Sequence, residues 1–419
     1  MAILSLALKS LLNRRFTVSL ILLSIALSAS LLLGVERLRV ESRNSFANTI
    51  SGTDLVVGAR SGAINLLLYS VFRVGDATNN ISWKSYKKFS QHQMVDWSIP
   101  ISLGDSHRGF RVMGTNLDYF RHYRYAQKRS LTFHKGQHFE QVYQAVLGHE
   151  VAQKLNYRVG QKIIIAHGAG KTSFTLHDDK PFEVVGILGP TGTPVDRTIH
   201  VPLEGIEAIH KDWVAGRQVA GLKVDAVEAL QKNLTPKAIT AFLVGLKSKI
   251  ATFRVQREIN DYRKEPLLAI LPGVALQQLW DLMSVAENAL LVVSALVVAV
   301  GLIGMLTVML SGLNERRREM AILRSVGARP GHILLLLTGE SLLLSLVGVA
   351  IGLLILYGGL FLTQPYIESH YGLYLPITTP SLREWFMLGL IGTSGLIIGL
   401  IPGYRAYRYS LADGMSIRI

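Results

Sequence analysis

The amino-acid sequence predicts a membrane protein with four transmembrane α-helices and a large extracytoplasmic α/β domain inserted between the first and second helices. Three observations lead to this fold class: four long apolar runs, a largely polar stretch between the first two runs, and arginines gathered at one end of the runs. We expect residues 1–34 to form an N-terminal cytoplasmic segment and the first span. Residues 35–283 should form the outer domain with its helical stalks, and residues 284–419 three further spans.

The apolar runs cover residues 16–33, 289–310, 333–362 and 385–401. Each is close to or above the ~17–25 residues that a helix needs to cross a bilayer. A cleavable signal peptide is the alternative interpretation of the first run, because basic residues precede it and small residues lie near its end. The run is too long for the apolar region of a typical signal peptide, so we expect it to stay as a span.

The positive charges that flank the runs predict the sidedness of the chain. Arginines precede the first run, five lie within residues 314–331, and more follow the fourth run, whereas the loop at 363–384 carries only Arg383 against two glutamates. Cytoplasmic loops of membrane proteins are enriched in Lys and Arg. Both termini and the 314–331 loop should therefore be cytoplasmic in a multi-pass membrane protein.

Composition narrows the partners of the outer domain. The chain has no cysteine, which excludes disulfides and thiolate metal sites. Residues 34–283 contain 32 Lys and Arg against 22 Asp and Glu, a net charge of +10. Because this domain should lie outside the cytoplasm, we expect no nucleic-acid partner. Anionic lipid head groups or an acidic partner are one interpretation of the charge, and a dispersed solvated surface is the other.

Within the outer domain, short runs with strand-like and helix-like patterns alternate. Both ends should be helical extensions of the neighbouring spans, at residues 35–48 and 275–287. The expected strands are 97–103, 109–114, 162–166, 173–176, 182–188, 198–201 and 238–246. The stretch 145–148 should lead into a helix at 149–155, and the other expected helices are 83–93, 203–210 and 249–262.

The apolar segment 63–72 has two interpretations. It packs into the core of the outer domain or against the second stalk helix, or it forms an apolar wall near the bilayer that holds an acyl chain or another apolar substrate.

Residues 168–172, Gly-Ala-Gly-Lys-Thr, resemble the end of a phosphate-binding loop. That motif needs a glycine five residues before Gly170, where this chain has Ile165, and a helix after the lysine. Strand-like runs follow instead, so we expect a tight basic hairpin. The chain should contain no catalytic residues, no cofactor and no nucleotide site of its own.

Ten of the twelve histidines lie in the outer domain. His134 and His138 are four residues apart, a spacing that on a helix places two metal ligands on one face. Gly136 between them favours a turn instead, so we expect scattered surface histidines and no metal site. Metal binding by some of these histidines stays open.

The loop between the second and third spans has a specific pattern. Met320, Leu323 and Val326 recur at helical spacing, Gly327 stands where a helix C-terminal glycine belongs, and Pro330 prevents continuation. The pattern predicts a short amphipathic helix. It either lies on lipid or docks into a groove of a cytoplasmic partner.

Residues 317–328, ending in Leu-Arg-Ser-Val-Gly-Ala, resemble the corresponding loop of the FtsX/MacB-like permeases of type VII ABC transporters, the group of lipoprotein-release and macrolide-export systems. Residues 145–202, with Val-Leu-Gly-His-Glu-Val-Ala at 146–152, are similar to the MacB-type outer core domain of that family. In the third span, Gly348 and Gly352 form the small-xxx-small face that allows close helix packing.

The resemblance implies a permease that transmits mechanical movement. It would couple ATP hydrolysis by a separate cytoplasmic ABC ATPase to movement of the outer domain and to handling of a substrate at the outer face of the membrane. A separate ATPase is expected because macrolide exporters carry a fused N-terminal ATPase, whereas this chain starts close to its first span. The residues expected to contact the ATPase are Arg317, Glu319, Met320, Leu323, Arg324 and Gly327.

A homodimer of the permease and contact with membrane lipid are also implied, and a periplasmic adaptor or a lipoprotein is a further partner that the resemblance allows. Two other functions remain open at this stage. One is a regulator that transports nothing and activates an extracytoplasmic hydrolase, and the other is a stand-alone membrane sensor. The substrate is not identified by the sequence.

Overall fold

The computed structural model divides the chain into two compact units. One unit, called here the outer domain, contains Ser42–Met283. The other, called here the membrane unit, contains the chain up to Glu41, Ser284–Ile367 and the last helix. The boundary between the two units at Glu41 lies within the stretch 35–48 that was predicted to extend the first span as a helix. The structure describes residues 15–126, 128–168, 177–211, 213–214, 217–218, 224–313, 317–325, 327–371 and 377–412.

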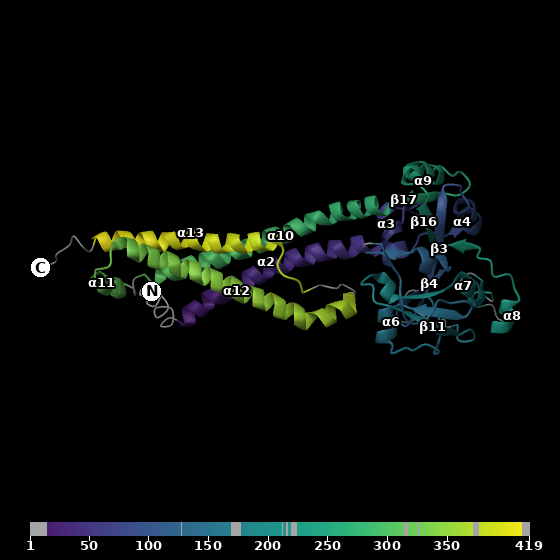
Figure 1. The fold of residues 1–419 in the computed structure, drawn as a ribbon, viewed down its shortest axis with the longest axis horizontal. Helices are drawn as coiled ribbons and strands as arrows, with labels where there is room; N and C mark the ends of the chain where they lie inside the picture. The colour runs from purple at the N-terminus through teal and green to yellow at the C-terminus, as the bar shows by residue number, and fades with distance from the viewer. Residues whose placement is uncertain are drawn as a thin grey trace. The chain divides into compact units, whose positions relative to one another are not determined.

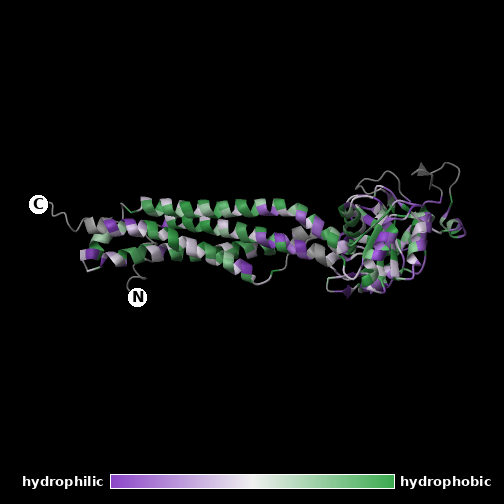
Figure 2. Cartoon of the chain, turned by 90° about the horizontal axis from the view of Figure 1, so that it is seen from above, coloured by the Kyte–Doolittle hydropathy of each residue, from purple (hydrophilic) through white to green (hydrophobic). Residues whose placement is uncertain are grey.

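Four helices in the described part of the chain are long and apolar enough to cross a membrane, as predicted. They are α2 (Arg15–Thr49), α10 (Pro272–Ser311), α12 (Pro330–Tyr371) and α13 (Leu382–Ala412). Their middle portions are predominantly hydrophobic in Figure 2. The helical extensions predicted after the first span and before the second are both present, since α2 continues to Thr49 and α10 begins at Pro272.

The outer domain is built on a mixed sheet of eleven strands among the described residues (Figure 1). The thirteen-residue strand β3 (Val95–His107) joins two halves, because its first part pairs with β16 and its second part with β4. Neighbours β4–β12 and β8–β11 are parallel, and the other neighbours are antiparallel. The main path runs β17 (Leu267–Ile270), β1 (Leu55–Ala59), β16 (Ala241–Leu246), β3, β4 (Phe110–Thr115), β12 (Thr198–Pro202), β8 (Gln144–Leu147), β11 (Phe182–Leu188), β7 (Phe133–Gly136).

Most predicted elements of this domain are present within two or three residues. The predicted strand at 162–166 is wrong as one element, because it splits into β9 (Lys162–Ile163) and β10 (Ala166–His167), which pair with different strands. The predicted strand at 238–246 also divides, into β15 (Ala238–Ile239), which pairs with β2 (Ile81–Ser82), and β16, which pairs with β1 and β3. The predicted strand at 173–176 lies outside the described residues. The helices are α4 (Trp83–Ser90), α5 (Asp118–His122), α6 (His149–Lys154), α7 (Leu203–Ile209), α8 (Ala226–Leu230) and α9 (Thr252–Asn260).

The apolar segment 63–72 forms α3 (Ala63–Leu67) and a following π-helical turn, Leu68–Phe72. Leu66, Leu67 and Tyr69 are at most 1% exposed and belong to the largest apolar cluster of the domain. The core interpretation is therefore confirmed, and the apolar wall for a substrate is wrong, because these side chains face β-sheet residues such as Val56 and Ile99.

Candidate coupling sites at the two ends of the membrane unit

The loop between the second and third spans contains a two-and-a-half-turn helix, α11 (Arg317–Ser325). It ends in a Schellman motif: the amide of Ala328 donates to Leu323 O (3.0 Å) and the amide of Gly327 to Arg324 O (2.9 Å). Gly327 has φ +96°, a conformation that a β-carbon disfavours. The helix therefore ends at a defined position before α12 begins at Pro330.

Met320 does not face outward from the membrane unit. It is 9% exposed and packs in a cluster with Leu313, Ile333, Leu337 and Ala406, which come from the inner ends of the chain's own spans. The prediction that Met320 enters a groove of a partner is therefore wrong. Helical periodicity identifies an apolar stripe but does not say which neighbour covers it, and here the spans cover its first residue.

The face of α11 that stays exposed is different from the predicted one. Ile322 is 64% exposed and Ala321 is also exposed, whereas Leu323 and Arg324 are half-buried. Arg317 and Glu319 lie in the first turn, where the structure describes the backbone only. Ile322 is thus the large apolar side chain that α11 presents, and the sequence pattern placed it beside the stripe rather than at its centre.

Gly348 and Gly352 of α12 lie against α2. A Cβ built on Gly348 would come within 2.8 Å of Ile25 Cβ, and one on Gly352 within 2.7 Å of Ala26 O. The two glycines therefore let the helix backbones approach closely. The third and first spans form one continuous contact at this level, together with Ala29.

A second close contact, between α12 and α13, was not predicted. Gly395 and Gly399 of α13 lie against Ser345 and Ser341 of α12, where a Cβ would come within 2.6 Å of the serine Cβ atoms. The spacing of four residues in both pairs is readable in the sequence as two facing small-residue stripes. The sequence alone does not predict which helix each stripe faces.

The outer end of the membrane unit carries a buried ion pair that sequence analysis missed. Arg37 Nε of α2 donates to Glu384 Oε1 of α13 at 2.8 Å, and both side chains are less than 10% exposed. Arg37 Nη2 also donates to Tyr357 OH and to Thr378 O, each at 2.7 Å. Glu384 in turn accepts from the amide of Ser381 in a capping box at the start of α13.

Four more charged side chains extend this network. Arg39 Nε donates to Glu287 Oε2 of α10 at 2.9 Å, and Glu36 is paired with Arg39 and with Arg383. The first span therefore holds α10, α12 and α13 at their outer ends through charge-assisted hydrogen bonds. The Ser-x-x-Glu capping box was the one local signal that pointed to Glu384.

The histidines of the outer domain are not scattered over its surface. His107, His177 and His200 are at most 6% exposed, so that expectation is wrong for them. Burial, and then the nearby Arg73 charge, lowers the pKa of His200 to about 3, so this side chain is neutral, and its Nδ1 donates to Val146 O at 3.3 Å in the core. His134 lies in β7 rather than on a helix, as the turn at Gly136 implied.

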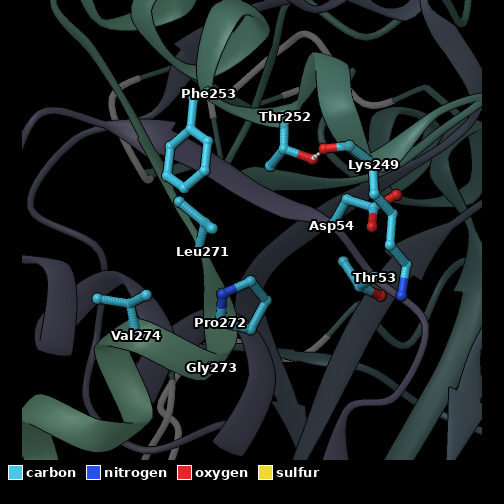
Figure 3. A pocket seen from close by; sticks show the side chains of 9 residues that line it. All are labelled: Thr53, Asp54, Lys249, Thr252, Phe253, Leu271, Pro272, Gly273 and Val274. Atoms are coloured by element: carbon cyan, nitrogen blue, oxygen red, sulfur yellow. Dashed lines mark hydrogen bonds between the residues drawn. The ribbon is translucent and has the colours of Figure 1, made fainter.

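An open pocket of about 420 Å³ lies in the outer domain where α10 begins (Figure 3). Asp54 and Lys249 give it a polar wall, and Phe253, which is 69% exposed, gives it an apolar one. Asp54 accepts from the amide of Leu246 at 2.7 Å. Its wide opening and mixed lining do not indicate a particular ligand.

Comparison with known proteins agrees with this architecture. The family model of the MacB-like periplasmic core domain matches residues 16–262, and that of the FtsX-like permease C-terminal region matches residues 291–411. The "Pyoverdine export ATP-binding/permease protein PvdT" of Pseudomonas savastanoi pv. phaseolicola is 26% identical over 269 residues, 61% of this chain and 36% of that protein. The "Macrolide export ATP-binding/permease protein MacB" of Azoarcus sp. is 24% identical over 250 residues, 56% of this chain and 33% of that one.

The "Uncharacterized ABC transporter permease YknZ" of Bacillus subtilis is 34% identical over 111 residues, which are 26% of this chain and 25% of that protein. Among solved structures, the periplasmic region of MacB from Actinobacillus actinomycetemcomitans aligns with a TM-score of 0.34 and 11% identity, over 55% of this chain and 94% of that one. The alignments to PvdT and MacB span about a third of those proteins. The model of the periplasmic core domain matches more than half of the chain, and the permease model matches its last three spans. The chain therefore belongs to the FtsX-like permeases with a MacB-like periplasmic core domain.

Proposed function

We propose that this chain is the permease subunit of an ABC transporter in the bacterial inner membrane. It works with a cytoplasmic ABC ATPase and passes the movement of that ATPase to the outer domain, where a substrate is handled at the outer face. Family membership supports this assignment, and the printed names of PvdT and MacB join an ATP-binding part to a permease part.

The observation that carries the proposal is the geometry of α11. A short helix between two spans, ended by a Schellman motif and fixed to the spans through Met320, presents the exposed side chain of Ile322. Large apolar side chains at the centre of a docking surface supply most of the energy of an interface. In this role Ile322 is the anchor, with Leu323 and Arg324 beside it.

The membrane unit offers a continuous route from α11 to its outer end. The Met320 cluster contacts the inner ends of the spans, the glycine contacts join α2 to α12 and α12 to α13, and Arg37 and Arg39 join all four helices beyond them. Packed helices of this kind move as bodies rather than deforming continuously. A shift of α11 would thus be passed to the helix ends that lead into the outer domain.

In the proposed assembly two copies of the chain act with two ATPase copies, and lipid surrounds the spans. ATP binding performs conformational work only as far as the two states of the complex differ in affinity for it. The mass of the purified complex in lipid nanodiscs measures this stoichiometry. A single permease copy per particle with full ATP turnover would contradict the dimer and leave the permease assignment intact.

Replacing Ile322 with Asp should weaken association with the ATPase by about 2–4 kcal/mol, roughly 30- to 700-fold, because a charge replaces an apolar anchor. The measurement is the amount of ABC ATPase retained per tagged chain, together with ATP turnover of the complex. Ile250→Asp is the matched control, since Ile250 is 93% exposed and lies in the outer domain. Equal retention by both variants at normal membrane levels would mean that α11 lies on lipid.

The proposed sidedness is tested by single cysteines in this cysteine-free chain. Gln91, at the end of α4, and Ser325, at the end of α11, are both exposed. In intact spheroplasts a membrane-impermeant maleimide should label Gln91→Cys, and Ser325→Cys only after the membrane is opened. Labelling of both from the same side would contradict the topology.

A further inference from the structure

The second half of the outer-domain sheet brings one carboxylate and three imidazoles together. Asp105 lies on β3, His167 on the paired strand β10, His177 follows β10 along the chain, and His210 caps α7. One ligand-capable atom from each of these side chains lies within 4.8 Å of the other three. Strand register places His167 directly opposite Asp105, although the two are 62 positions apart.

The separations match those of metal ligands. Asp105 Oδ1 lies 3.1 Å from His167 Nδ1 and 3.5 Å from His210 Nε2, and the two histidine nitrogens are 3.3 Å apart. Four ligands held about 2.0–2.1 Å from a Zn²⁺ ion at tetrahedral angles lie about 3.3–3.4 Å from one another. The three atoms therefore outline one face of such a tetrahedron, and His177 supplies the fourth corner with a small side-chain movement.

The surroundings orient the ligands. His210 Nδ1 donates to Ile206 O at 2.8 Å, and its Nε2 is directed at Asp105 and His167. A backbone carbonyl on the second ring nitrogen is the usual arrangement for a metal-bound histidine. On β3, the register shifts between Leu103 and Asp105, around Gly104 with φ +153°, and such bulges redirect the side chain that follows.

Burial and neighbouring charges shift the pKa values of Asp105 and His177. Asp105 is 3% exposed; burial alone would raise its pKa, but the hydrogen bonds and charges of His167 and His210 outweigh this and hold the pKa well below its usual value. Burial, followed by the neighbouring His210, lowers the pKa of His177 to about 4.

We propose that Asp105, His167, His177 and His210 form a binding site for a divalent transition-metal ion, with Zn²⁺ as the best fit. Three nitrogen donors and one oxygen donor suit Zn²⁺, whereas Ca²⁺ and Mg²⁺ require mainly oxygen ligands. The side chains of His167 and His210 are 41% and 25% exposed, so the ion exchanges with solvent from their side. Its ligands come from β3, from β10 and its continuation, and from α7, so binding links these elements of the outer domain.

The test uses the full-length chain in nanodiscs, with an affinity tag that contains no histidine, stripped with a chelator and then titrated with Zn²⁺. We expect one ion per chain to remain after desalting, measured by elemental mass spectrometry, and a rise in the melting temperature that grows with free Zn²⁺. Co²⁺ should give the strong visible absorption of a tetrahedral site. His167→Gln and Asp105→Asn should each weaken binding about a hundredfold or more, since loss of a supporting group alone costs about 10–100-fold.

The matched control is His134→Gln with His138→Gln, which removes two outer-domain histidines outside this group of ligands. It should keep the stoichiometry, the affinity and the Co²⁺ spectrum. His167→Gln changes a half-exposed side chain and should fold normally, which circular dichroism and gel filtration verify. Two results would overturn the site. One is that the unmodified chain retains no Zn²⁺, and the other is that His167→Gln retains as much Zn²⁺ as the unmodified chain.

Discussion

Replacing Arg37 with Met should lower the free energy of unfolding of the membrane unit by about 3–5 kcal/mol, because it leaves the Glu384 carboxylate buried without its cation. The side chains of Arg37 and Glu384 are 9% and 7% exposed, so water does not take over the lost hydrogen bond. Tyr357 OH also loses the donor Arg37, whereas Thr378 O keeps the hydrogen bond from Tyr357 OH at 2.7 Å. The measurement is an SDS titration in mixed micelles followed by circular dichroism.

A double-mutant cycle separates this charge effect from simple loss of packing. Glu384→Gln keeps an acceptor for the capping box with Ser381 and removes the charge. Arg37→Met combined with Glu384→Gln should therefore be more stable than Arg37→Met alone. Arg254→Met is the control, because Arg254 is 69% exposed and its pair with Glu258 should contribute at most about 1 kcal/mol. Additive losses in the cycle would contradict a coupled buried pair.

Gly352→Val should destabilise the contact between α2 and α12 by about 1–3 kcal/mol, the range for overpacking in a close-packed interior. The added Cβ would approach Ala26 O to 2.7 Å, and a backbone atom cannot rotate away as a side chain can. The two helices must therefore separate. The same SDS titration measures the loss, and ATP turnover of the complex reports whether the movement is still passed on.

Gly358→Val is the matched control for this change. Gly358 lies on the same helix, and a Cβ there meets no atom within 4 Å. Gly358→Val changes the helix propensity by the same amount but creates no collision, so it should lower the stability much less than Gly352→Val does. Adding Gly348→Val to Gly352→Val should increase the loss further, because the next turn then collides with Ile25. Equal stability of Gly352→Val and Gly358→Val would contradict close packing of α2 and α12.

Much of the fold was predictable because its signals are local. The four spans follow from length and hydropathy, and β11 (Phe182–Leu188) has the bounds that its apolar run predicted. The end of α11 at Gly327 followed from glycine's tolerance of positive φ. The division of 162–166 into two strands was not predictable, since each half pairs with a different strand that lies far away in the sequence.

The coupling sites were predicted only in part. The position and length of α11 followed from its pattern, but the side chain that it presents is Ile322 rather than Met320. The periodicity of a helix defines its apolar side within about one residue, and the packing of the spans decides which of those residues is covered. Arg37 and Glu384 are 347 positions apart in the sequence, and nothing in the residues around Arg37 predicted that they would pair.

The sequence by itself therefore determined the family, the spans, the outer-domain class and the C-terminal end of the helix between the second and third spans, since each depends on neighbouring residues and on backbone geometry. The tertiary structure decided which distant side chains meet: Met320 with the spans, Arg37 with Glu384, and Asp105 with three histidines. The physical reason is that strand register and helix contacts set these distances, and a one-residue change in register would move Asp105 to the other face of its sheet.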